Sequence, residues 1–177
     1  GSLDHPNIVK ILEHSVTADG LPYIVMEFLS GQSLSEAIAD EAMDEERLVR
    51  LMIDIANALS HAHNRLVVHR DIKPSNIMIV PEAEGQMKAV LVDFGIAKVL
   101  TEDSQGHALT QTGEVFGSPL YMSPEQCYGK TLDRRSDLYS LGCVMYEMCT
   151  GSPPIKGGSL LETIQLQTTD MPAPAAT

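Results

Sequence analysis

The octapeptide HRDIKPSN at residues 69–76 is the most informative part of this sequence. Apolar runs lie on both sides of it, at residues 66–68 and 77–80, so we expect a loop held between two short strands. Asp71, Lys73 and Asn76 place a base, a cation and a neutral oxygen ligand on this one loop. Phosphoryl transfer needs such a set, because its transition state depends on in-line positioning and charge neutralisation.

A D-F-G triplet follows at residues 93–95, at the end of another apolar run. Residues 77–80 and 88–92 are predicted to pair as a hairpin, which places the Asp93 carboxylate at a strand end where it can hold Mg²⁺. Residues 99–121 then form a long polar stretch. Loops longer than about 12–15 residues are uncommon in compact domains, so we expect this stretch to be either functional or disordered.

The remaining pattern alternates short strands with helices. Ser33 and Glu36 have the S-x-x-E spacing of a capping box, which predicts a short helix to about residue 40. Asp44 is expected to cap a long helix with an apolar stripe. Further elements are expected at residues 8–12 and 23–28 (strands), 137–149 (a buried central helix, apolar nearly all round) and 160–166 (a short helix).

Composition narrows the function classes. The 177 residues carry a net charge of −12, which argues against nucleic acid as a partner and against attraction to an anionic membrane. The apolar runs fall far short of the roughly 20 residues of a spanning helix. Three cysteines without C-x-x-C spacing fit a reducing compartment, so we expect a cytoplasmic protein. Cys143, Cys149, Met52 and Met145 are expected to fill the core.

Taken together, the motifs resemble those of a serine/threonine protein kinase. H-R-D-x-K-x-x-N and D-F-G are followed in order by S-P-E at residues 123–125, where the family usually has A-P-E, and by DLYSLG at residues 137–142. TQT at residues 110–112 and YMSPEQ at residues 121–126 are most similar to the eukaryotic-like kinases of bacteria. The resemblance implies an α+β, protein-kinase-like fold, with a mainly helical large lobe and a remnant of small-lobe strands.

Catalytic roles follow from the resemblance position by position. Asp71 is similar to the base that accepts the proton of the substrate hydroxyl, and Lys73 to the cation that neutralises the transferred phosphate. Asn76 and Asp93 match the two Mg²⁺ ligands. ATP and Mg²⁺ are the implied cofactors, and Ser or Thr side chains of proteins are the implied substrates. Lysine at position 73 matches the serine/threonine pattern rather than the tyrosine one.

The resemblance also implies a nucleotide pocket. Met26 is similar to the gatekeeper before the hinge between the lobes. The Glu27 carbonyl and the Leu29 amide are expected to face the adenine edge, with Met78 as the pocket floor. Ser118 resembles the hydroxyl residue that hydrogen-bonds the catalytic aspartate and lysine.

Regulatory and structural roles form a third set. Arg70 resembles the arginine that binds an activation-loop phosphate, and Thr110 and Thr112 lie in the usual autophosphorylation region. The alternative is that both threonines are ordinary polar loop residues. Glu125 is expected to be structural, and Asp137 is expected to cap backbone N–H groups of the catalytic loop.

The sequence departs from the family at both ends. No G-x-G-x-x-G and no strand lysine precede the motifs, so we expect residues 1–28 to be a remnant of the small lobe and hinge and residues 29–177 to be an incomplete large lobe. The segment alone is expected to transfer phosphate poorly. Its first 28 residues are expected to be mobile or paired with another chain, and the exposed strand edge is a candidate for self-association. Whether the parent protein has a membrane anchor outside this segment stays an open question.

Three functions remain to be separated. The leading one is transfer of the ATP γ-phosphate to Ser or Thr hydroxyls of proteins by a longer parent chain. The second is a pseudokinase-type binding module that signals by contact. The third, a small-molecule phosphotransferase, ranks lowest, because such enzymes lack D-F-G followed by a threonine-bearing loop and S-P-E.

Overall fold

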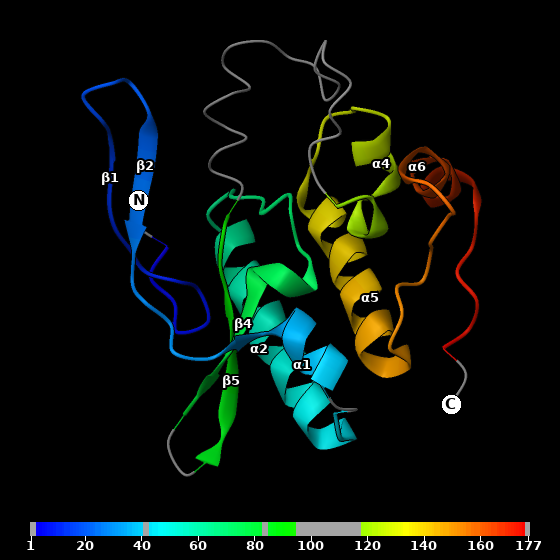
Figure 1. Ribbon diagram of the computed structural model, residues 1–177, viewed down its shortest axis with the longest axis horizontal. Coiled ribbons are helices and arrows are strands. Elements are labelled where there is room, and N and C mark those ends of the chain that lie inside the picture. Colours follow the sequence, from blue (N-terminus) through cyan, green and yellow to red (C-terminus); the bar gives the residue numbers. More distant parts are fainter. Residues whose placement is uncertain (1–2, 41–42, 83–84, 95–117, 176–177) are drawn as a thin grey trace.

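The computed structural model describes residues 3–40, 43–82, 85–94 and 118–175 (Figure 1). Within these ranges a small sheet and two long helices form the centre of the molecule, and a strand pair stands to one side. In chain order the elements are β1 (Ile11–Val16), β2 (Pro22–Met26), β3 (Gln32–Ser33), α1 (Leu34–Asp40), α2 (Glu45–His63), η1 (Pro74–Asn76), β4 (Ile77–Pro81), β5 (Met87–Leu91), η3 (Pro119–Tyr121), α4 (Pro124–Cys127), α5 (Arg134–Thr150) and α6 (Leu160–Thr169).

The central sheet has the antiparallel order β3-β4-β5. The predicted hairpin is confirmed, with Ile77 opposite Leu91 at one end and Pro81 opposite Met87 at the other. Strand β5 packs against α2. Both faces of β4 and β5 are packed: Ile77, Ile79 and Leu91 enter the main core on one face, and Val80 and Val90 belong to a second buried cluster on the other.

Helix α2 begins as the sequence predicts. The Asp44 side chain accepts a 2.8 Å hydrogen bond from the Arg47 backbone N–H, and Glu45 and Glu46 lie in the first turn, where the helix dipole favours negative charge. One face of the helix enters the main core. Its buried residues are Leu51, Met52, Ile55, Ala58, Leu59 and Ala62.

Helix α5 corrects one prediction. It is not buried all round, since Leu138 and Met145 are 53% and 41% exposed and Cys149 is also exposed. These three positions lie seven and four residues apart, so they share one helix face that points away from the core. The opposite face carries Leu141, Val144 and Met148 into the main core, and Cys143 is buried as predicted. The assignments of Met145 and Cys149 to the core were therefore wrong.

Two predicted strands are also corrected. Residues 66–68 are not a strand: Leu66 has a φ of 61° and is 93% exposed, because the chain turns there after α2. Residues 7–9 lie beside β5 instead of starting β1, with the Val9 N–H donating to the Leu91 carbonyl at 2.9 Å. Among the described residues, strands β1 and β2 pair with no strand other than each other, and most of their side chains are exposed.

The Ser33–Glu36 capping box is confirmed. Glu36 accepts from the Ser33 N–H at 2.7 Å, while the Ser33 hydroxyl oxygen accepts from the Glu36 N–H at 3.2 Å. The helix predicted for residues 160–166 is α6, which extends to Thr169. No helix in the described part of the chain is long and apolar enough to cross a membrane.

Candidate active site

The loop between α2 and β4 carries the predicted catalytic residues, and His69 fixes it to the hairpin. His69 is fully buried, its ring lies 4.6 Å from the Phe94 ring, and its Nε2 lies 3.0 Å from the Val92 carbonyl oxygen. A carbonyl can only accept, so Nε2 carries the hydrogen and Nδ1 accepts from the Asp71 N–H at 3.3 Å. Burial lowers the pKa of His69, despite the opposing effect of Asp137 nearby, so the ring is neutral.

Asp137 at the start of α5 holds the same loop from the other side. Its carboxylate accepts hydrogen bonds from the backbone N–H groups of His69 and Arg70, both at 2.8 Å. The predicted capping role of Asp137 is therefore observed. Arg70 has a φ of 67°, a left-handed conformation that costs a non-glycine residue about 1–3 kcal/mol. The two bonds to Asp137 offset this cost and keep the loop in one shape.

Asp71, Lys73 and Asn76 meet within hydrogen-bond distance. The Lys73 Nζ donates to Asp71 Oδ2 at 2.8 Å, and the Asn76 Nδ2 donates to the Asp71 carbonyl at 2.9 Å and to Oδ2 at 3.1 Å. Asn76 is buried, whereas the side chains of Asp71 and Lys73 are 21% and 24% exposed. A supported carboxylate that still reaches solvent is suited to accept a proton from an incoming hydroxyl.

Asp93 is brought to the same end of the hairpin by backbone pairing. The Val92 N–H donates to the Asn76 carbonyl at 3.0 Å, directly after the pair Ile77 and Leu91. Asp93 is exposed and has a φ of 56°, a conformation that aspartate tolerates better than most residues. The last residue of the motif, Gly95, lies outside the described residues.

The donor atoms at this end of the hairpin fit Mg²⁺. Asn76 uses its amide nitrogen toward Asp71, so its carbonyl oxygen Oδ1 is the atom left for a cation, and Asp93 offers a carboxylate. Mg²⁺ prefers oxygen ligands and is usually held by one or two carboxylates together with substrate phosphates and waters. No cluster of three or more His, Cys, Asp or Glu side chains that could hold a metal ion occurs among the described residues.

The predicted adenine side is a small apolar cluster. Leu29 and Met78 pack with Val92 against the buried residues Val9, Val80 and Val90. Glu27 uses its amide toward the Lys10 carbonyl at 2.9 Å and its carboxylate toward the Lys10 N–H at 2.8 Å, and these bonds do not use its carbonyl. Met26, at the end of β2, is 37% exposed.

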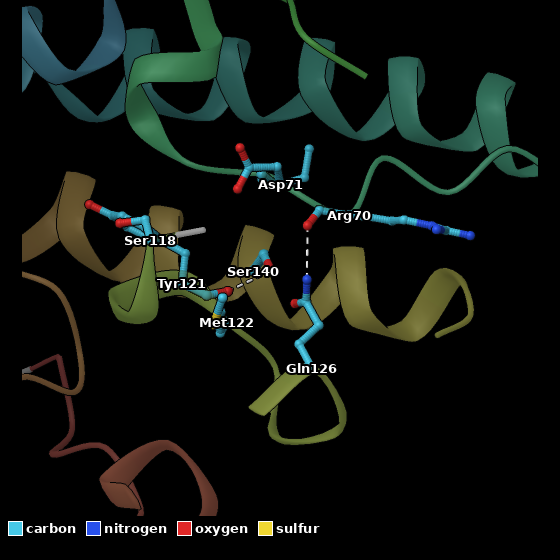
Figure 2. A pocket seen from close by; sticks show the side chains of 8 residues that line it. Arg70, Asp71, Ser118, Tyr121, Met122, Gln126 and Ser140 are labelled. Atoms are coloured by element: carbon cyan, nitrogen blue, oxygen red, sulfur yellow. Dashed lines mark hydrogen bonds between the residues drawn. The ribbon is translucent and has the colours of Figure 1, made fainter. Parts of the chain in front are cut away.

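The segment after residue 117 faces the catalytic loop. Ser118, Tyr121, Met122 and Gln126 line a small hollow together with Arg70 and Asp71, and Figure 2 shows Gln126 reaching from α4 toward the backbone of Arg70. Glu125 accepts a 2.5 Å hydrogen bond from the Ser136 hydroxyl. Burial alone would raise the pKa of Glu125, but this hydrogen bond and others outweigh it, so the pKa is lowered. Thr110 and Thr112 lie outside the described residues.

Three contacts were not anticipated from the sequence. The Tyr121 hydroxyl donates to Glu147 at 2.5 Å, and burial together with this bond raises the pKa of Tyr121 far above its ordinary value. His63 Nε2 lies 2.7 Å from Asp137 Oδ2. Gln126 Nε2 donates to the Arg70 carbonyl at 2.8 Å. The only sequence signal for any of them is S-x-x-Q at residues 123–126, a capping-box spacing.

The chain is similar in sequence to several serine/threonine-protein kinases of bacteria. The chain is 40% identical over 173 residues to the serine/threonine-protein kinase pkn3 of Myxococcus xanthus, covering 97% of this chain and 32% of that protein. It is 44% identical over 166 residues to the probable serine/threonine-protein kinase PknB of Bifidobacterium longum, covering 89% and 23%. It is 40% identical over 177 residues to the serine/threonine-protein kinase PknB of Mycobacterium tuberculosis, covering 98% and 27%.

The chain therefore spans only about a quarter to a third of the length of these relatives. The model of the protein kinase domain matches residues 1–175, nearly the whole sequence. The predicted α+β kinase fold is confirmed by this match and by the arrangement of helices and small sheets. This chain belongs to the protein kinase domain family.

Proposed function

We propose that this chain, as part of a longer protein, transfers the γ-phosphate of ATP to Ser or Thr hydroxyls of protein substrates. The observation that carries the proposal is the cluster around the Asp71 carboxylate, whose Oδ2 lies 2.8 Å from the Lys73 Nζ and 3.1 Å from the Asn76 Nδ2. The relatives, each named as a serine/threonine-protein kinase, support the same reaction.

Each member of the cluster has a separate task in this proposal. Asp71 orients the substrate hydroxyl and accepts its proton, while Lys73 holds the Asp71 carboxylate in place and neutralises charge on the transferred phosphate. Asn76 fixes Asp71 from the buried side and offers Oδ1 to a metal ion, as Asp93 offers its carboxylate. Bound Mg²⁺ supplies charge neutralisation on the phosphates of the nucleotide.

Nucleotide binding is assigned to the cluster of Leu29, Met78 and Val92. An apolar wall of this kind suits a flat adenine ring, because ligand pockets are mostly apolar with a few placed polar groups. The Glu27 carbonyl and the Leu29 amide are the polar groups proposed for the ring edge, with Met26 beside them.

Regulation is the next part of the proposal. Arg70 and Asp71 are adjacent, yet Figure 2 shows the guanidinium and the carboxylate pointing in opposite directions along the loop. Phosphate on Thr110 or Thr112 would bind the Arg70 guanidinium and order the segment before Ser118. Mass spectrometry of the active full-length protein should find one of these threonines modified, and finding neither modified would argue against this regulation.

The reaction itself is tested by a transfer assay on the full-length protein. Wild type, Asp71→Asn and Asp170→Asn are incubated with radiolabelled ATP, Mg²⁺ and a generic protein substrate. Loss of a general base is expected to reduce transfer by roughly 10²–10⁴-fold in Asp71→Asn. Asp170, an exposed carboxylate after α6, provides the matched charge control and should behave as wild type.

The same assay separates the alternatives. Equal transfer by wild type and Asp71→Asn would contradict the role given to Asp71. A wild-type protein that binds nucleotide without transferring phosphate would instead identify a binding module. Transfer to small-molecule hydroxyls and to no protein would favour the small-molecule phosphotransferase.

A further inference from the structure

Gln126, in the first turn of α4, connects two parts of the molecule through its two amide atoms. Its Oε1 accepts from the Ser123 N–H at 3.0 Å, and its own N–H lies 3.4 Å from the Ser123 hydroxyl oxygen, which completes a capping box at the start of α4. Its Nε2 points away from this cap and donates to the Arg70 carbonyl at 2.8 Å (Figure 2). The cap therefore uses one half of the amide and the catalytic loop uses the other.

The bond to Arg70 falls on the most constrained part of that loop. Arg70 has a φ of 67°, and the peptide groups on both sides of it are held by side chains. Asp137 binds its N–H at 2.8 Å, Gln126 binds its carbonyl, and the N–H of the same following peptide lies 3.3 Å from the His69 Nδ1. A left-handed residue can relax by rotating a neighbouring peptide group, so these three contacts oppose that rotation.

The peptide that Gln126 holds is also the one that sets the direction of the Asp71 side chain. The Arg70 carbonyl and the Asp71 N–H belong to one rigid plane, so rotation of this plane moves the Asp71 Cα and the carboxylate beyond it. An error of about 1 Å in the placement of a catalytic group can cost on the order of a hundred-fold in rate. The α4 cap holds the other end of the Gln126 amide, with Nε2 directed at this plane.

We infer that Gln126 is a positioning residue for Asp71, acting through the Arg70 carbonyl; this rests on the phosphoryl-transfer function proposed above. Its effect is on how Asp71 is aimed and not on nucleotide binding. It should therefore appear in kcat, while the KM for ATP stays near the wild-type value.

Substitution of Gln126 by glutamate separates the positioning of Asp71 from the capping of α4. A glutamate keeps the acceptor oxygen for the Ser123 N–H, and glutamate at this position of a capping box is favourable. It has no N–H to donate to the Arg70 carbonyl, and it places a negative charge against that carbonyl. Gln126→Glu therefore keeps the cap and removes the loop contact, whereas Gln126→Ala removes both.

The test compares full-length wild type, Gln126→Glu, Gln126→Ala and Gln165→Glu. Gln165 is an exposed residue of α6, so Gln165→Glu makes the same charge change at a position that takes part in neither the α4 cap nor the loop contact. We expect kcat to fall at least about ten-fold in Gln126→Glu with the KM for ATP within error of wild type, and the melting temperature to fall less than in Gln126→Ala, because only the bond to the Arg70 carbonyl is lost. Gln126→Ala should lose both activity and thermal stability, and Gln165→Glu should lose neither.

Amide hydrogen exchange gives a second reading that does not depend on activity. The Asp71 N–H shares the peptide plane with the Arg70 carbonyl, so its exchange rate should rise about ten-fold in Gln126→Glu and stay unchanged in Gln165→Glu. A Gln126→Glu protein with wild-type kcat, or with wild-type exchange at Asp71, would overturn the inference and leave Gln126 as a helix cap. If wild type itself transfers no phosphate, the proposed function fails, and the exchange rate alone still decides the positioning role.

Discussion

His63 at the end of α2 and Asp137 at the start of α5 are 74 positions apart in the sequence, and their side chains meet in a 2.7 Å hydrogen bond. Both side chains are removed from solvent, at 8% and 1% exposure. The same carboxylate binds the backbone of His69 and Arg70, so one buried group joins two helices and the catalytic loop.

Replacing Asp137 by asparagine is expected to destabilise the protein by roughly 1–3 kcal/mol, because one of its three buried donors then faces an amide NH₂ and loses its acceptor. Transfer activity should fall with it, since fewer hydrogen bonds then hold the loop on that side. The free energy of unfolding is measured by urea titration. Asp133→Asn, at the exposed cap of the same helix, is the control and should change little, because asparagine caps helices well. Equal stability of Asp137→Asn and wild type would contradict the account.

Stability should depend on pH through His69. Burial lowers the pKa of this ring in the folded protein, while in the unfolded chain it takes up a proton near pH 6.5. The unfolded state therefore binds more protons below about pH 6.5, and stability is full above that pH and is lost as the pH falls below it. The slope from this one group is at most about 1.4 kcal/mol per pH unit.

The measurement is urea unfolding of wild type and His69→Phe at pH 7.5, 6.5 and 5.5. Phenylalanine keeps a ring against Phe94 but cannot titrate, so the acid loss should be smaller in the variant. His5, whose pKa is also lowered, first by burial and then by His61, is present in both proteins and cancels in the comparison. Identical pH slopes for the two proteins would exclude this role for His69.

The metal dependence of the reaction should change on replacement of Asn76. Asn76→Ala removes Oδ1, the proposed Mg²⁺ ligand, and the two hydrogen bonds to Asp71. We expect the Mg²⁺ concentration for half-maximal rate to rise about ten-fold or more, since removal of one ligand or its support typically costs that much in metal affinity. Ser75→Ala, an exposed neighbour in the same short helix η1, should keep the wild-type Mg²⁺ curve. A wild-type curve for Asn76→Ala would argue against its role as a ligand.

Two glycine-to-alanine substitutions should change the stability of the protein in opposite directions. A Cβ on Gly31 would collide with the backbone carbonyl oxygen of Ile79, next to the pairing of β3 with β4, so Gly31→Ala is expected to cost about 1–3 kcal/mol. Gly142 lies inside α5 with open space where its Cβ would be, so Gly142→Ala should stabilise by about 0.5–1 kcal/mol through helix propensity. Thermal unfolding monitored by circular dichroism measures both. A stabilised Gly31→Ala protein would contradict the tight approach of the two strands.

Local patterns in the sequence predicted local structure well. Asp44 and the Ser33–Glu36 pair identified two helix starts, because a cap depends on residues only three positions apart. The apolar runs on both sides of residues 81–86 identified the β4–β5 hairpin for the same reason. Leu66 shows the limit: an apolar run suggests a strand, but it does not say whether a neighbouring strand is present to pair with it.

The contacts of the candidate site likewise fall into local ones, which the sequence predicts, and long-range ones, which it does not. Asp71, Lys73 and Asn76 could be grouped from sequence, because they lie on one loop of six residues. The contact of Gln126 with Arg70 could not, since it joins segments 56 positions apart and depends on how α4 is placed over the loop. Met145 was misassigned for a related reason, because apolar side chains all around a helix do not tell which face the rest of the chain covers.

The hydrogen bonds that Asp137 and Gln126 form with the Arg70 backbone also limit when the loop can fold during protein synthesis. The side chains that hold the two peptide groups of Arg70 are made 67 and 56 residues after it. A nascent chain that has just been extended through the HRDIKPSN motif thus contains Asp71, Lys73 and Asn76 but lacks the side chains of Gln126 and Asp137 that hold their loop in place. The loop can therefore adopt its folded conformation only after the start of α5 has been synthesised.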